Sequence, residues 1–233
     1  MRIGKLLKKG QKSIDQGEQM SFLPDDAAMQ PRQTVVTAKE AVMNSDTAAL
    51  LMDSYIAFDV ETTGLNPSVE RIVELGAVRF VHGKPCGEFS TLVNAKHRMS
   101  VPSIEITHIT NDMVAAAPAE EDIYPALLAF LGDAVEGKTL LCGHNARFDM
   151  DFLRTTLERL GFDASLCYVD TLKLSRKYAG KLDNYKQPTV AERYGVDIHN
   201  AHRAADDARV CGEILWHIMQ EDSFREKISE EKA

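Results

Sequence analysis

The sequence feature that most restricts the fold is a short apolar run at 55–60, whose end carries the acidic residues Asp59 and Glu61. Side chains alternate between the two faces of a strand, so these two carboxylates share one face. Their repulsion and desolvation are costly inside a sheet, and a bound cation removes that cost. An exposed edge strand with solvated acids is the alternative, but the apolar residues at 55–58 favour a buried central strand. The run therefore predicts a cation site at the end of a buried strand.

The hydrophobic pattern around this run predicts an α/β domain. We expect strands at 55–60, 71–81, 88–93, 139–142 and 166–169, and helices at 123–131, 146–160 and 204–219. An antiparallel meander followed by alternating helices and strands is typical of a mixed sheet between helical layers. We assign 54–222 to this domain, 1–53 to a flexible N-terminal extension with a short helix within 39–52, and 223–233 to a charged C-terminal tail.

The charge distribution excludes some classes of protein. The formal net charge is −8, and residues 1–53 hold seven basic and seven acidic residues, so the whole excess lies in 54–233. Such an acidic domain is not a bulk nucleic-acid coat protein. Four scattered cysteines without a CxxC pair argue against a disulfide framework. The chain shows neither a signal-peptide core nor an apolar run of about 18 residues, so we expect a cytoplasmic protein that does not bind membranes.

Two further segments carry candidate catalytic groups. Asp149 lies where a predicted strand passes into a helix, at the edge of the sheet where α/β proteins gather their sites. His202 and Asp207 stand at the start of the helix at 204–219. Asp206 competes with Asp207, but we expect Asp206 to turn toward solvent and Asp207 to lie along the core edge. An Asp in a first helical turn is usually a cap residue, so these groups gain meaning only beside Asp59.

Together these segments resemble the DnaQ-like (DEDDh) 3′–5′ exonucleases, a family that includes the proofreading exonuclease of bacterial replicases. The motifs are Asp59-Val60-Glu61-Thr62-Thr63-Gly64, then Gly143-His144-Asn145 with Phe148-Asp149, then His202 followed after four residues by Asp207. The resemblance covers about 55–219 of the sequence. It implies a ribonuclease H-like fold, an α/β class with a five-stranded mixed sheet flanked by helices. It also implies release of nucleoside monophosphates from a nucleic acid with a free 3′ end.

Four carboxylates without nearby thiolates make a hard oxygen site, which suits Mg²⁺ or Mn²⁺. The resemblance implies two such divalent cations, held by Asp59, Glu61, Asp149 and Asp207, with Asp59 bridging them. In this two-metal mechanism the cations activate water and stabilise the leaving oxygen. His202 is implied as the general base, since imidazole exchanges protons near neutral pH.

The resemblance also assigns residues to the 3′-terminal nucleotide. These substrate-binding residues are Thr62, Thr63, Gly64, Leu65, His108, Asn145 and Phe148. Leu65 is equally compatible with plain packing in a turn. The family often has His-Gly before Ile-Thr, whereas this chain has Thr107-His108 there. That departure affects the expected details of how the 3′-terminal nucleotide is bound, and it does not affect the expected cleavage chemistry.

A short segment in the extension suggests a partner. Gln19-Met20-Ser21-Phe22-Leu23 resembles the pentapeptide by which bacterial proteins dock onto the replication sliding clamp, with Gln19, Phe22 and Leu23 as the contact residues. A linear motif in a tail can fold onto a groove. A chance match in a tail that contains Met and Ser is the alternative. The candidate partners are therefore the clamp or a polymerase subunit.

Three functions fit these observations. The leading one is an exonuclease acting on single-stranded DNA. The alternatives are an RNA or oligonucleotide exonuclease of the same family, and a clamp- or polymerase-associated adaptor without activity, against which the intact set of acidic residues argues. The acidic domain further predicts a compact site that contacts few phosphates and depends weakly on salt.

Overall fold

The computed structural model describes residues 34–230, so Gln19, Phe22 and Leu23 lie outside the described residues. Within this part of the chain a mixed sheet has six strands in the order β1-β6-β5-β2-β3-β4. Their bounds are β1 Val36–Glu40, β2 Ser54–Thr62, β3 Ile72–Val81, β4 Lys84–Leu92, β5 Leu140–Gly143 and β6 Ala164–Asp170. The strands β2, β3 and β4 form the expected antiparallel meander, and β1, β6, β5 and β2 are parallel neighbours. The predicted α/β class is confirmed.

The prediction of five strands is wrong by one edge strand. Residues assigned to the N-terminal extension form β1, which pairs with β6 from Val36 opposite Ala164 onward. Val36 is buried, and the N–H of Val35 donates to Asp163 Oδ1 at 2.8 Å. The segment is short and its partner lies 128 residues further on, so local periodicity gives little sign of the pairing. Helix α1 (Ser45–Asp53) follows β1 and buries Leu51, so the folded part starts before residue 54.

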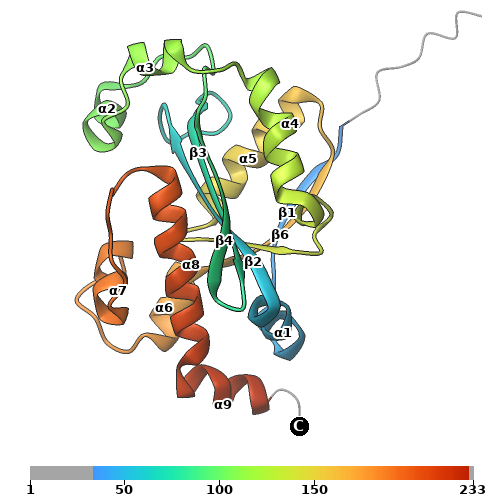
Figure 1. Ribbon diagram of the computed structural model, residues 1–233, viewed down its shortest axis with the longest axis vertical. Coiled ribbons are helices and arrows are strands. Elements are labelled where there is room, and N and C mark those ends of the chain that lie inside the picture. Colours follow the sequence, from blue (N-terminus) through green and yellow to red (C-terminus); the bar gives the residue numbers. More distant parts are fainter. Residues whose placement is uncertain (1–33, 231–233) are drawn as a thin grey trace, which may run out of the picture. The chain divides into compact units, whose positions relative to one another are not determined.

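Helices cover both faces of the sheet (Figure 1). One core layer lies between the sheet and α1, α6, α7, α8 and α9, and a second lies between the sheet and α4 and α5. The bounds of the helices are α2 Val101–Thr107, α3 Asn111–Ala116, α4 Glu120–Leu131, α5 Arg147–Leu160, α6 Thr171–Tyr178, α7 Gln187–Tyr194, α8 Ala204–Gln220 and α9 Asp222–Glu230, with a 3-10 turn at Gly132–Glu136. In residues 34–230 no helix combines the length and the apolar character needed to cross a membrane.

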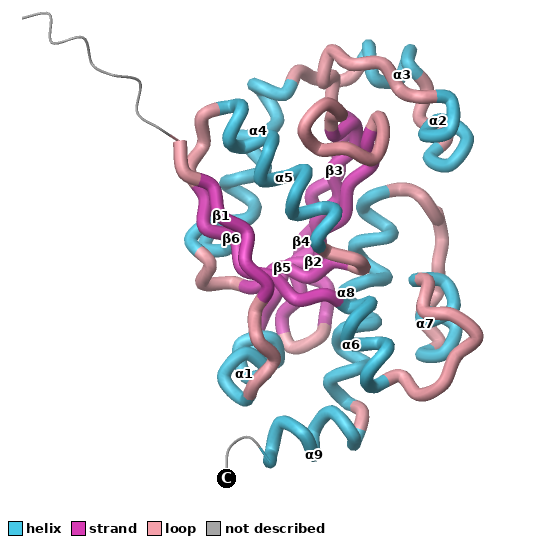
Figure 2. The backbone as a smooth tube through the Cα atoms, turned by 180° about the vertical axis from the view of Figure 1, so that it is seen from behind, coloured by secondary structure: helices cyan, strands magenta, loops and turns pink. Residues whose placement is uncertain are grey.

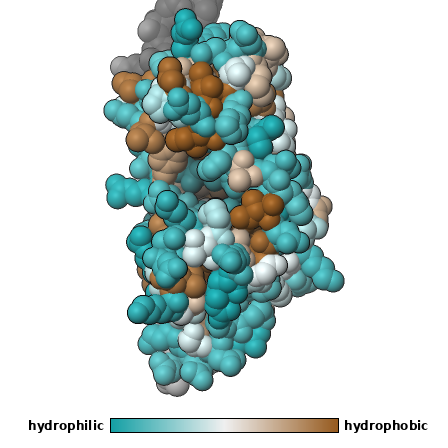
Figure 3. Space-filling model, turned by 90° about the vertical axis from the view of Figure 1, so that its left-hand side faces the viewer, coloured by the Kyte–Doolittle hydropathy of each residue, from teal (hydrophilic) through white to brown (hydrophobic). Residues whose placement is uncertain are grey.

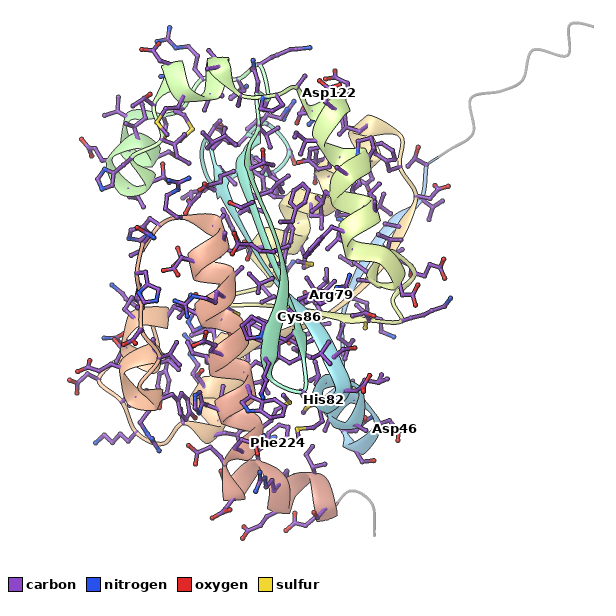
Figure 4. The ribbon with its side chains drawn as sticks, in the orientation of Figure 1. Asp46, Arg79, His82, Cys86, Asp122 and Phe224 are labelled. Carbon is purple, nitrogen blue, oxygen red and sulfur yellow. The ribbon has the colours of Figure 1, made fainter. Side chains whose placement is uncertain are left out.

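Helices α4, α5 and α8 confirm the helices predicted from apolar spacing at 123–131, 146–160 and 204–219. The C-terminal segment differs from the expected charged tail. Its described part belongs to α9, where Phe224 is buried and meets the ring of Tyr178 edge-on, with centroids 5.1 Å apart (Figure 4). Phe224, together with the partly buried Ile228, therefore docks the helix onto the domain.

A close approach between α8 and the sheet fixes the end of the sheet that matters for function. Asp59 on β2 is paired with Gly76 on β3. A Cβ atom on Gly76 would lie 2.1 Å from the carbonyl carbon of Ala204, the first residue of α8. Only glycine permits this contact. The first turn of α8 therefore lies directly beside the strand position that carries Asp59.

Candidate active site

A hollow of about 240 Å³ opens where β2 ends and α5 and α8 begin. It contains the five residues predicted to be catalytic, together with Asn145 and Phe148 from the predicted substrate-binding set. The residues that line it are Asp59, Val60, Glu61, His144, Asn145, Phe148, Asp149, Gln187, Pro188, Ile198, Ala201, His202 and Asp207. They come from four separate stretches of sequence, so the hollow exists only in the folded chain.

Strand β2 and helix α5 supply three of the four carboxylates. Asp59 and Glu61 line the same hollow, as the alternation along β2 predicts. Asp149 lies in the first turn of α5 and is buried, and its Oδ1 accepts the backbone N–H of Val60 at 3.1 Å. Because this bond joins α5 to the middle of the acidic motif on β2, the three carboxylates are held as one unit.

The loop before α8 places the fourth carboxylate and the histidine. Asp207 Oδ2 accepts the backbone N–H of His202 at 2.9 Å, and His202 adopts a left-handed backbone conformation with φ of 63°. The buried Glu74 on β3 anchors this loop by accepting from the guanidinium of Arg203 at 2.6 Å and from the N–H of Ala204 at 3.2 Å. A strained residue held by its surroundings is common at functional sites.

The structure separates the two adjacent carboxylates at the start of α8. Asp207 faces the hollow, whereas Asp206 Oδ2 accepts the N–H groups of His199 and Asn200 at 2.9 and 2.8 Å. Asp206 also pairs with Arg209. Although partial burial acts in the opposite sense, these bonds hold the pKa of Asp206 below its usual range. Asp206 therefore closes the loop, and its oxygens are occupied within the protein.

Burial, with repulsion from neighbouring acids, disfavours ionisation of the carboxylates in the hollow. Burial, followed by the charges of Asp149, Glu61 and Asp207, raises the pKa of Asp59 well above its usual range. Burial and the charge of Asp207 raise the pKa of Glu61 to about 8. Burial raises the pKa of Asp149 to about 8 in spite of the hydrogen bond from Val60, and it also raises the pKa of Asp207. An uncompensated cluster of this kind is unfavourable at neutral pH.

This donor set fits divalent cations. One ligand atom each from Glu61, His202 and Asp207 lie within 4.8 Å of one another. Carboxylate oxygens dominate the hollow, and cations bound there would offset the cost of burying these charges close to one another. The groups that would hold them are the carboxylates of Asp59, Glu61, Asp149 and Asp207.

Comparisons with known proteins agree with this geometry. The family model RNase_T, described as exonuclease, matches residues 56–215 of this chain. The chain belongs to this exonuclease family. The membership confirms the DnaQ-like 3′–5′ exonuclease family predicted from the three motifs.

The curated relatives of this exonuclease domain are much longer proteins. A PolC-type DNA polymerase III of Thermotoga maritima is 36% identical over 168 residues, which are 72% of this chain and 12% of that protein. The PolC-type DNA polymerase III of Staphylococcus aureus is 37% identical over 169 residues, 72% of this chain and 11% of that protein. This chain therefore spans only a small part of the length of the relatives that it matches.

Solved structures confirm the ribonuclease H-like fold of the exonuclease domain. E. coli exonuclease I in complex with a dT13 oligonucleotide superposes with a TM-score of 0.65 at 17% identity, covering 76% of this chain and 43% of that one. Exonuclease X in complex with 5′ overhanging duplex DNA superposes with a TM-score of 0.56 at 25% identity, covering 78% of this chain and 100% of that one.

Five of the residues predicted to bind the terminal nucleotide do not line the hollow of this exonuclease domain, namely Thr62, Thr63, Gly64, Leu65 and His108. The two threonine hydroxyls bond within the turn, from Thr62 to the carbonyl of Gly64 and from Thr63 to Glu70. Leu65 is 85% exposed and His108 is also exposed, at the end of α2. The exposed side chains of Leu65 and His108 can therefore contact a ligand only outside the hollow.

Sequence reasoning missed the residues that hold the walls of the hollow in place. Gln187 lines the hollow and donates to the carbonyl of Asp207 at 2.7 Å. The ring of His144 bridges Thr171 and the carbonyl of Tyr185, at 3.0 and 2.8 Å. The sequence does mark Glu74, because an acidic side chain inside an apolar strand needs a partner when it is buried. Nothing in the sequence identifies that partner as Arg203.

Proposed function

We propose that this chain is a metal-dependent 3′–5′ exonuclease of the DEDDh type, which releases nucleoside monophosphates from single-stranded DNA. The observation that carries the proposal is the meeting of four carboxylates and one histidine, from three stretches of sequence, in a single hollow. Burial raises the pKa values of Asp59, Glu61 and Asp149, with repulsion from neighbouring acids as a further cause, and such shifts gather at functional sites. A purely structural role does not require so many acids in one place.

The proposed roles follow from the positions of the side chains. Two Mg²⁺ or Mn²⁺ ions bound by the four carboxylates supply Lewis-acid chemistry at the scissile phosphodiester. His202 is exposed beside Glu61 and Asp207, where its imidazole takes a proton from the attacking water. Asp207 also fixes the backbone of His202 through the N–H bond at 2.9 Å. Asn145 and Phe148 line the hollow beside the acids and contact the terminal nucleotide.

The rim of the hollow suits unpaired bases. Helix α2 is tied to the end of β2, because the Ser103 hydroxyl donates to the carbonyl of Thr63 at 3.0 Å. Leu65, Val101 and Ile106 are exposed nearby, and Figure 3 shows apolar side chains gathered at the level of α2 and α3 above a hollowed stretch of this face. The faces of unstacked bases are apolar, so these side chains favour a single-stranded end. We therefore keep Leu65 as a proposed contact of the substrate.

The relatives support DNA as the substrate and a polymerase as a partner. Exonuclease I and exonuclease X are described in complexes with DNA, and the curated relatives are DNA polymerases. By this likeness we propose that the chain acts on DNA 3′ ends made by a polymerase, with the sliding clamp as a second proposed partner through Gln19 and Phe22. A pull-down with each partner, repeated with Gln19→Ala plus Phe22→Ala, separates the two.

The deciding experiment compares DNA and RNA oligomers of one sequence, labelled at either end, with Mg²⁺, with Mn²⁺ and with chelator. We expect mononucleotides from the 3′ end of DNA, faster than from RNA, and none with chelator. Asp59→Ala abolishes this release while the fold is kept, and Asp206→Asn, next to the site on α8, serves as the matched acidic control that keeps metal-dependent release. Release from the 5′ end, or full release by Asp59→Ala, contradicts the proposal.

A further inference from the structure

The acidic charge of the domain is unevenly spread. Residues 171–194, which contain α6, α7 and the loop between them, hold six basic and two acidic residues and carry a net charge of +4. The rest of 54–233 holds 14 basic and 26 acidic residues and carries −12. A domain that repels nucleic acid on average thus presents one region of opposite sign. Local potential, rather than net charge, decides where a polyanion binds.

The basic side chains of α6 share its solvent face. Leu174, Ser175 and Tyr178 are buried, whereas Arg176 and Lys177 are exposed on the opposite side of the helix. Lys181 and Lys186, in the loop that leads to α7, are exposed as well. Figure 2 shows α6 and α7 on the same side of the domain, and both pack against α8. We call Arg176, Lys177, Lys181 and Lys186 the basic flank.

The basic flank adjoins the hollow at both of its ends. Asp170 caps the start of α6 and also accepts the N–H of Asn145, a residue of the hollow, at 3.1 Å. Lys186 directly precedes Gln187, which lines the hollow from the start of α7.

The cations of the basic flank are not neutralised by acidic side chains. In the described part of the chain none of the four forms an ion pair with a carboxylate, whereas Lys173 is paired with Glu40. Two arginines close to Asp207 in the sequence are neutralised as well, Arg203 by Glu74 and Arg209 by Asp206 and Glu213. A polyanion that leaves the acidic hollow therefore meets unpaired positive charge along α6 and the loop before α7.

We propose that the basic flank binds the backbone phosphates of the strand that precedes the 3′-terminal nucleotide. The inference rests on the proposed exonuclease function and adds the path of the substrate outside the hollow. The hollow repels phosphates until its cations are bound, so positive charge beside it holds the strand in place. The weak salt dependence predicted from net charge is then wrong, because cleavage of long oligomers falls steeply as salt is added. The logarithm of kcat/KM falls by about 0.7 for each tenfold rise in salt and for each phosphate contacted.

The test uses a triple variant, Arg176→Gln, Lys181→Gln and Lys186→Gln, in the full chain. Lys177 is kept because its ammonium lies over the Tyr178 ring, 4.9 Å from the centroid. The matched control is Lys84→Gln, Lys96→Gln and Lys138→Gln, which removes the same charge from exposed positions outside residues 171–194. Two substrates are compared over a range of NaCl concentrations. One is a 20-residue oligothymidylate, and the other is the p-nitrophenyl ester of thymidine 5′-monophosphate, which has no upstream phosphates.

We expect the triple variant to cleave the ester as the wild type does, and to lose at least tenfold in kcat/KM on the oligomer at low salt. For the oligomer, the slope of log(kcat/KM) against log[NaCl] becomes shallower by about 2, since three phosphate contacts are lost. The control variant keeps the wild-type slope. Equal slopes for the triple variant and the wild type overturn the inference, as does an equal loss in the control.

Failure of the proposed function looks different, because the wild type then cleaves neither the ester nor the oligomer. If the triple variant does not fold, as judged by its thermal unfolding, Arg176→Gln and Lys186→Gln are tested singly. Each is expected to reduce the slope by about 0.7, and an unchanged slope in both overturns the inference.

Discussion

Replacing Asp149 with asparagine tests the electrostatics of the hollow directly. The amide keeps the shape of the side chain and can still accept the 3.1 Å hydrogen bond from the N–H of Val60, but it removes one buried charge. Burial raises the pKa of Asp149 to about 8, so the folded protein holds a proton that the unfolded chain releases near pH 4. A carboxyl whose pKa is raised by folding contributes stability at low pH that is lost as the pH rises through the folded pKa. The Asp149→Asn variant escapes this loss.

The size of the effect follows from the pKa. Each pH unit between the unfolded and the folded pKa changes the free energy of unfolding by at most about 1.4 kcal/mol. From pH 5 to pH 8 the metal-free wild type thus loses at most about 4 kcal/mol relative to Asp149→Asn. Because Asp59 and Glu61 share the same repulsion, we expect about half of this, ~2 kcal/mol, which corresponds to a difference of about 4–8 °C in Tm.

The assay is thermal unfolding in chelator at pH 5 and pH 8, followed by titration with Mg²⁺ at pH 8. We expect the Tm advantage of Asp149→Asn over the wild type to grow between the two pH values, and Mg²⁺ to stabilise the wild type more than the variant. Asp206→Asn is the control, since its carboxylate is bonded to Asn200 and Arg209 and its loss destabilises the protein at both pH values. An advantage that is absent at pH 8, or the same at both pH values, refutes the reasoning.

Three further predictions concern groups around the hollow. His202→Ala is expected to lose most of its turnover while keeping the Mg²⁺-induced rise in Tm, and an unchanged pH–rate profile in this variant removes His202 as the base. Gly76→Ala places a Cβ 2.1 Å from the carbonyl carbon of Ala204, so we expect a loss of about 2 kcal/mol or more in unfolding free energy together with lower activity. Gly87→Ala on β4, whose nearest neighbour lies at 3.7 Å, is expected to be neutral, and equal unfolding curves for the two glycine variants contradict this account. Glu74→Gln leaves Arg203 with a weaker partner, so we expect a loss of about 1–3 kcal/mol and a reduced kcat with a retained metal response, and an unchanged kcat shows that the loop does not depend on this pair.

Local sequence patterns contain much of the fold. Alternation along 55–60 puts Asp59 and Glu61 on one face, and the apolar spacing of α5 and α8 fixes those helices closely. The choice of Asp207 over Asp206 also followed from local geometry, because the positions beside Ala208 and Cys211 face the core. Each of these inferences needs only the repeat of one helix or strand and the knowledge of which of its faces is buried.

Pairings between distant segments were harder to foresee. Strand β1 forms because β6 offers it a free edge. Its five residues do alternate in burial, but Val36 alone among them is fully buried, so the local signal is weak. Gln187 and His144 secure the hollow through bonds to backbone carbonyls, which every residue possesses and no sequence pattern marks. Such bonds depend on where chain segments meet, and that is set by packing of the whole domain.

The sequence by itself therefore determined which groups carry the proposed chemistry: carboxylates and a histidine in three ordered motifs, each on a recognisable element. Only the tertiary structure decided how these groups are assembled and where charge accumulates. Gly76 brings α8 against β3 beside Asp59, and Glu74 ties Arg203 so that His202 and Asp207 face the same hollow. The net charge of −8 is a sum over the sequence, whereas a strand of nucleic acid responds to the local electrostatic field. That field is positive at the basic flank and negative at the acidic hollow.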